Sequence, residues 1–88
     1  MTQQEFYDEL KELARQKGVA VRLETGDFDG GHCIVDGQGV ILINRRHPLT
    51  RRINVLARAV HGLGLDDLYV VPAVRDRIED EVASRVAE

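Results

Sequence analysis

Cysteine, aromatic residues and long apolar runs are all scarce in this chain of 88 residues. Its single cysteine, Cys33, excludes an internal disulfide and fits the reducing cytoplasm, which is where we expect the protein to act. No apolar run approaches the roughly 20 residues of a membrane span, so no membrane partner is expected. The stretch 1–10 is polar and acidic, unlike a secretory signal peptide.

The chain also lacks an excess of basic residues, because its net charge is −3. General affinity for nucleic acid depends on neutralising phosphates, which this balance does not favour. The few aromatic residues form no stacking set and no recognition helix is visible, so nucleic acid is not the expected partner. With 43% apolar and 31% charged residues, the composition is that of a globular protein.

The length allows one domain, residues 1–88, near the lower limit at which a chain buries a sufficient core alone. A homodimer would cover further apolar surface. The apolar segment 68–72 looks exposed. We expect it first to pack against the fold and, as a second interpretation, to form a contact between two copies.

Residues 2–17 have the pattern of a first helix. Thr2 and Glu5 are spaced as a capping box, in which both side chains satisfy backbone N–H groups. Gly18 is a typical stop after a helix that runs from about Gln3 to Lys17. The apolar residues at helical spacing are Phe6, Leu10, Leu13 and Ala14.

Three strands are predicted next, over residues 19–23, 31–35 and 40–43. The first alternates apolar and other residues, and the third is apolar on both faces, as in a central strand. The sequence Asp36-Gly37-Gln38-Gly39 is a hairpin turn signal. The second and third strands should therefore pair antiparallel, because so short a link cannot support a crossover.

Two further helices complete the predicted fold. One begins near Leu49 and ends at Gly62 or Gly64, and the other begins at Pro72. Their apolar faces consist of Leu49, Ile53, Leu56, Ala57 and Val60, and of Val74, Ile78, Val82 and Val86. The sequence thus predicts an α+β fold in the order α-β-β-β-α-α, with helices packed on a small, mainly antiparallel three-stranded sheet.

Four short sequences within the range 18–63 carry a family resemblance. They are Gly30-Gly31-His32-Cys33, Ile41-Leu42-Ile43-Asn44, Arg51-Arg52 and Leu56-Ala57. Read in this order of elements, the chain resembles the IrrE-like zincin peptidases and their minimal single-domain relatives. The resemblance implies a zincin-like fold.

The zinc motif of that family, HExxH, is absent. The resemblance places Arg58 at the first histidine, Ala59 at the glutamate and Gly62 at the second histidine. Two histidines at i and i+4 must share a helix face to hold zinc, with the glutamate as general base. His61 cannot restore the motif, since the residues four positions away are Ala57 and Leu65. We therefore expect no catalytic residue, no bound metal and no cofactor.

Four potential metal ligands remain: His32, Cys33, His47 and His61. Their spacing matches no known ligand pattern, and neighbours on a strand point to opposite faces. We interpret Cys33 as a small buried apolar group, and His61 as a residue suited to the negative end of a helix dipole. A metal-binding protein or a small hydrolase that uses these four residues is the alternative function.

Arginines cluster at Arg45, Arg46, Arg51, Arg52 and Arg58. Arginine binds carboxylates and phosphates through bidentate hydrogen bonds, so the cluster could hold an anion or an acidic partner. The competing interpretation is a solvated face, or internal pairing with Asp27, Asp29, Asp66 and Asp67. The Gly-rich and Asp-rich sequence 26–31 is interpreted as a turn, anchored on the core by Phe28.

The leading hypothesis is a non-catalytic module that binds an unknown protein or peptide at a sheet edge or groove. The metal-binding or hydrolytic alternative comes second. An anion or nucleic-acid binder that uses the arginine cluster comes third.

Overall fold

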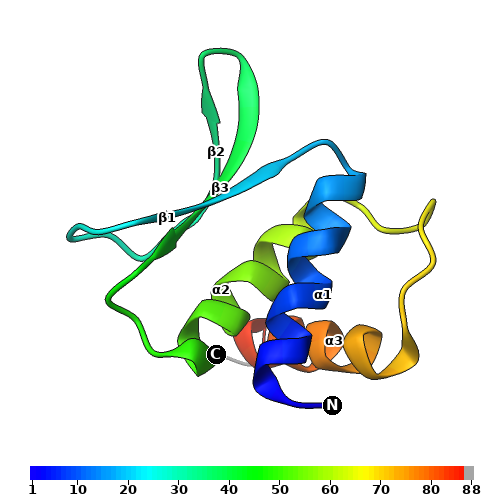
Figure 1. Cartoon of the computed structure of the whole chain (residues 1–88). Helices are drawn as coiled ribbons and strands as arrows, with labels where there is room; N and C mark the ends of the chain where they lie inside the picture. Colours follow the sequence, from blue (N-terminus) through cyan, green and yellow to red (C-terminus); the bar gives the residue numbers. More distant parts are fainter. Residues whose placement is uncertain (87–88) are drawn as a thin grey trace.

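The computed structural model describes residues 1–86, and their side chains as far as residue 84. The elements are α1 (Gln3–Gln16), β1 (Ala20–Glu24), β2 (Gly31–Val35), β3 (Gln38–Asn44), α2 (Leu49–Gly62) and α3 (Pro72–Val86). The predicted order α-β-β-β-α-α and the α+β class are confirmed (Figure 1). Within the described chain, no helix has the length and apolar character needed to cross a bilayer.

The sheet is mixed, with strand order β1-β3-β2. β2 pairs antiparallel with β3, as predicted, but β1 pairs parallel with β3, starting from Ala20 opposite Val40. The prediction of a mainly antiparallel sheet was therefore wrong for one of its two pairings. The reason is that β3, and not β2, is the neighbour of β1 in the sheet. The hairpin turn makes β2 and β3 run in opposite directions, and β3 runs in the same direction as β1.

The turn between β2 and β3 consists of Asp36 and Gly37, with φ angles of 52° and 79°. Positive φ at both central residues is the requirement of a type I′ turn, whose twist matches that of the flanking strands. Aspartate tolerates this region better than most residues, and glycine adopts it freely. The predicted hairpin is confirmed, and its tip extends away from the helices (Figure 1).

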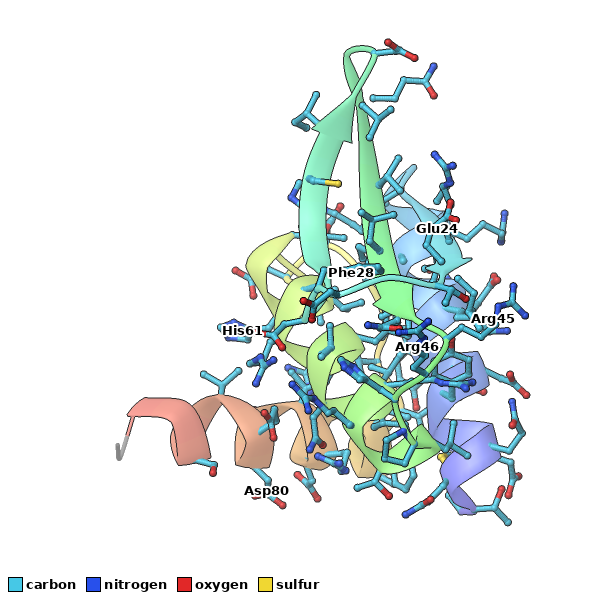
Figure 2. All side chains as sticks on the ribbon, turned by 90° about the vertical axis from the view of Figure 1, so that its left-hand side faces the viewer. Glu24, Phe28, Arg45, Arg46, His61 and Asp80 are labelled. Carbon is cyan, nitrogen blue, oxygen red and sulfur yellow. The ribbon has the colours of Figure 1, made fainter. Side chains whose placement is uncertain are left out.

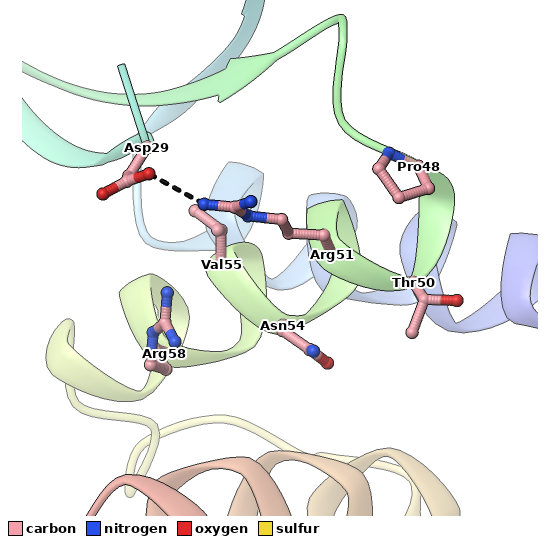
Figure 3. A pocket seen from close by; sticks show the side chains of 7 residues that line it. All are labelled: Asp29, Pro48, Thr50, Arg51, Asn54, Val55 and Arg58. Atoms are coloured by element: carbon pink, nitrogen blue, oxygen red, sulfur yellow. Dashed lines mark hydrogen bonds and ion pairs between the residues drawn. The ribbon is translucent and has the colours of Figure 1, made fainter.

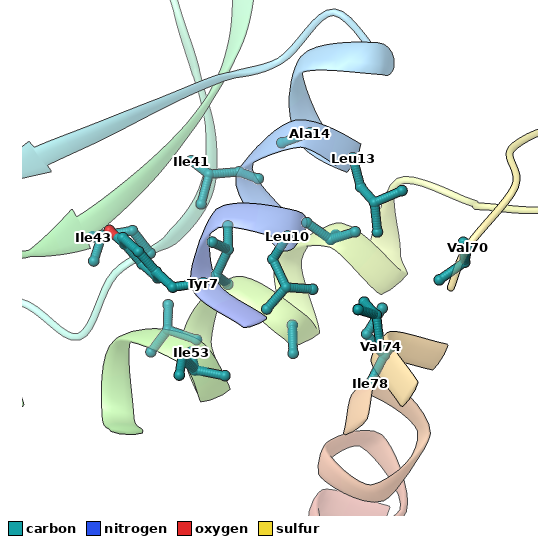
Figure 4. Close-up of a cluster of buried hydrophobic side chains, with 14 residues drawn as sticks. Tyr7, Leu10, Leu13, Ala14, Ile41, Ile43, Ile53, Val70, Val74 and Ile78 are labelled. Carbon is teal, nitrogen blue, oxygen red and sulfur yellow. The ribbon is translucent and has the colours of Figure 1, made fainter. Parts of the chain in front are cut away.

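The core lies between the sheet and the helices α1 and α2, and it continues on to α3, which packs on these two helices (Figure 1). Ile41 and Ile43 of β3 are fully buried in one cluster with Leu10 of α1 (Figure 4). Leu56 of α2 belongs to the same cluster and is also fully buried. Burying a side chain of this size contributes about 1.5–3 kcal/mol to stability. The predicted apolar faces of α1 and α2 are thus the ones that pack.

The third helix packs on α2 through Val74 and Ile78, with Val82 partly buried. Val86, the last residue of its predicted stripe, lies outside the described side chains. The preceding segment 68–72 seals the core through Val70, which is 4% exposed, whereas Tyr69 is 79% exposed. This segment packs against the fold, as the first of the two interpretations has it.

Candidate functional site

A groove of about 430 Å³ lies between α2 and the loop that leads into β2 (Figure 3). Residues of the loop, of the start of α2 and of one face of α2 line it: Asp29, Pro48, Thr50, Arg51, Asn54, Val55 and Arg58. Four of these residues, at positions 51, 54, 55 and 58, follow the spacing i, i+3, i+4 and i+7. That spacing places them in one stripe along the helix surface.

Glycine lets the loop approach α2 closely. A Cβ atom on Gly30 would lie 2.6 Å from the carbonyl oxygen of Leu42 and 3.2 Å from Cγ1 of Val55. Val55 is 4% exposed, so the loop and the apolar floor of the groove are packed together. Gly30 also has a φ of 98°, which side-chain-bearing residues rarely adopt.

Asn44, at the end of β3, holds the same loop from the other side. Its Nδ2 donates to the carbonyl oxygens of Gly26 at 2.9 Å and of Phe28 at 2.7 Å. Its Oδ1 accepts from the N–H of Arg46 at 3.0 Å. Phe28 is only partly buried and lies outside the core cluster, so the predicted anchor was wrong. The sequence signal was a polar residue that ends an apolar strand.

Side chains of α3 hold two residues of the stripe, Arg58 and Asn54, in place. Nη1 of Arg58 donates to Oε1 of Glu81 at 3.0 Å, and the two side chains are 29% and 11% exposed. Arg77 of α3 donates to Oδ1 of Asn54. These contacts orient Arg58 and Asn54 along the groove. They also keep the charge of Glu81 compensated where solvent is largely excluded.

An exposed ion pair spans the groove mouth. Nη2 of Arg51 donates to Oδ1 of Asp29 at 2.8 Å (Figure 3), and their side chains are 52% and 84% exposed. Solvent screens a pair of this kind strongly, so it contributes little to stability.

The other arginines of the predicted cluster lie elsewhere. Arg52 donates through Nε to the carbonyl oxygen of His47 at 2.8 Å and through Nη2 to that of Arg45 at 2.7 Å. It therefore ties down the connector before α2. Arg45 and Arg46 are exposed at one side of the molecule (Figure 2), and Arg46 borders a hollow beside the loop. The structure thus brings only Arg51 and Arg58 of this cluster into the groove.

The four candidate metal ligands do not form a cluster. His32 and Cys33 are neighbours on β2, His47 lies in the connector, and His61 lies near the other end of α2 (Figure 2). Among the described residues, no group of three histidines, cysteines or acids is placed to hold a metal ion. Cys33 is partly exposed, so its interpretation as a buried residue was wrong.

Comparison with known proteins adds no relative. No family model, no curated protein and no solved structure matches the chain. The residues at the expected zinc motif positions, Arg58, Ala59 and Gly62, include no zinc ligand, and Arg58 is engaged with Glu81. A zinc ion does not fit this helix face, because a protonated guanidinium offers no lone pair.

Within residues 1–86, no strand pairs with the outer edge of β2. The two-residue turn makes Val35 and Gln38 a hydrogen-bonded pair, and such pairs alternate along an antiparallel ladder. By this alternation, His32 and Ile34 direct their backbone N–H and C=O groups outward. The strand carries no charged residue, proline or bulge, which are the usual protections of an edge. The other edge strand, β1, carries the ion pair of Arg22 with Glu24.

Proposed function

We propose that the protein is a non-catalytic, cytoplasmic module that binds an extended segment of a partner protein by strand addition to β2. The observation that carries the proposal is the unprotected edge of β2 beside the groove on α2. Edges of this kind pair readily with another chain, and main-chain hydrogen bonds supply the affinity. The side chain of Ile34, which is 66% exposed, adds apolar surface for the partner.

The arrangement also assigns roles to the two faces of a bound segment. Successive side chains of a strand point to opposite sides of the sheet. One set would lie over the outer face, beside Cys33 and Leu42, and the other would turn toward α2 and the groove. Affinity would thus come from the edge and selectivity from the groove.

A zincin-like fold is part of this proposal. It is supported by an antiparallel edge strand that lies next to a central strand, which in turn leads into the helix where the family carries its zinc motif. In this chain that helix presents Arg58, Ala59 and Gly62 instead of ligands and base. Substrate binding would be retained and catalysis lost.

Selection of random heptapeptides displayed on phage, with the whole chain as bait, tests the proposal. We expect enrichment of extended, alternating sequences. Ile34→Pro removes an outward N–H without breaking the ladder to β3, so we expect it to weaken binding of the enriched peptide about tenfold or more. Ile34→Thr keeps that N–H and should change the affinity less than about threefold. Titration calorimetry measures all three proteins.

Failure of any peptide to enrich, or equal affinity of wild type and Ile34→Pro, would contradict strand addition. A second copy of the chain is the other occupant that the edge could take. Light scattering would then give twice the 9.9 kDa chain mass for wild type and the single mass for Ile34→Pro. That result would replace the peptide partner by a homodimer.

A further inference from the structure

The stripe on α2 presents cationic donors on either side of an apolar floor. Arg51 and Arg58 are seven positions apart, about two helical turns, and Val55 lies between them. Figure 3 shows the guanidinium group of Arg51 reaching Asp29, with Arg58 farther along the same helix. Each group has five N–H donors, and its ion pair uses one of them.

The two ion pairs differ in how easily they exchange. Glu81 is 11% exposed, so water competes poorly for its ion pair with Arg58. Asp29 is 84% exposed, so water readily replaces Arg51 as its partner. Arg51 is therefore available to an incoming carboxylate, whereas Arg58 keeps its partner and adds positive charge to the wall.

We infer that the groove recognises an acidic side chain of the bound segment, whose carboxylate takes the place of Asp29 on Arg51. This inference rests on the proposed function, because it requires a segment held on β2. Asp29 already shows which chemistry fits at this position: a carboxylate on a short side chain, at hydrogen-bond distance from Arg51. In the free protein, Asp29 acts as a built-in competitor for the same arginine.

Because Asp29 competes with the partner's carboxylate for Arg51, removing the charge of Asp29 distinguishes this inference from a general effect of net charge on binding. Asp29→Asn should free Arg51 and strengthen binding of an acidic peptide by about two- to fivefold, the range expected for an exposed ion pair. Asp66→Asn makes the same change of net charge, and Asp66 lines neither the groove nor the hollow beside the loop that Arg51 shares with Asp27. It should leave the affinity unchanged within error.

The test uses the peptide enriched by phage display and a copy in which its glutamate or aspartate is replaced by the matching amide. Calorimetry on wild type should give about tenfold weaker binding for the amide peptide, because a charge-assisted hydrogen bond is lost. Arg51→Gln should remove most of that difference, as a double-mutant cycle reveals. Arg45→Gln, an exposed arginine outside the groove, should preserve it.

The possible outcomes distinguish a failure of this inference from a failure of the proposed strand addition. Enriched peptides without an acidic preference, or equal affinities for the acidic and amide peptides, would overturn this inference while strand addition stands. An acidic preference that survives Arg51→Gln would also overturn it. No enrichment at all would overturn the proposed function and this inference together.

Discussion

Gly30 is the residue on which the geometry of the groove depends most directly. Alanine at this position must adopt a φ of 98° and place its Cβ 2.6 Å from a backbone oxygen that cannot easily move. We expect Gly30→Ala to lower the free energy of unfolding by about 2–4 kcal/mol, through backbone strain and steric overlap. Urea denaturation, monitored by circular dichroism, measures the loss.

Gly62 provides the matched control at the residue scale. A Cβ atom there meets nothing within 4 Å, and the residue is the last of α2. Gly62→Ala should raise the free energy of unfolding by up to about 1 kcal/mol, because alanine loses less backbone freedom on folding. Equal effects of the two substitutions would show that the chain tolerates a Cβ atom at position 30 without steric overlap.

At the scale of elements, the start of α2 depends on Arg52 instead of a capping side chain. Pro48 occupies the N-cap position and makes no side-chain hydrogen bond. Arg52→Ala removes two hydrogen bonds to backbone carbonyls and should lower the free energy of unfolding by about 1–3 kcal/mol. Arg51→Ala, which removes an exposed ion pair, should change it by less than about 1 kcal/mol.

Urea titrations of Arg52→Ala and Arg51→Ala under the same conditions show which of the two arginines stabilises the fold. If Arg51→Ala costs as much as Arg52→Ala, then the pair with Asp29 stabilises the fold, and its exchange for a partner carboxylate becomes unfavourable.

Local sequence signals predicted the elements better than their assembly. The helix on Leu56 and Val60 follows from apolar periodicity, and the hairpin follows from Asp36-Gly37. The parallel pairing of β1 with β3 has no local signal, since it joins residues about twenty positions apart, such as Ala20 and Val40.

The candidate site was predicted only in part, for the same reason. The arginines were visible as a cluster, but adjacent positions on a helix point about 100° apart. Arg51 therefore faces the groove while Arg52 faces the connector. Their carboxylate partners, Asp29 and Glu81, come from distant segments, and of these only Asp29 was considered as a partner from the sequence.

At the scale of the whole molecule, acid should destabilise the fold through three surface carboxylates. Hydrogen bonds from the backbone and side chain of Thr2 lower the pKa of Glu5 below its ordinary 4.5. A hydrogen bond from Arg15 lowers the pKa of Glu12, and one from Lys17 lowers that of Asp67 below its ordinary 3.8. The folded protein thus binds fewer protons than the unfolded chain in this range.

The sign follows from the direction of these shifts. The stabilisation is complete above the ordinary values of 4.5 and 3.8, and is lost as the pH falls through the lower values of the folded state. Urea titrations from neutral pH down to about pH 3 should show this decline. Asp67→Asn should flatten the lower part of the curve of stability against pH. An unchanged slope for Asp67→Asn would contradict a contribution from the link between Lys17 and Asp67.

The strand β2 contributes no residue to the core cluster of the described chain. Detaching it would remove no residue from that cluster and would leave the pairing of β1 with β3 intact. Local opening at this strand therefore requires far less free energy than global unfolding. A segment that pairs with β2 would shift the equilibrium toward the closed strand, so binding of the partner would also stabilise the attachment of β2 to the sheet.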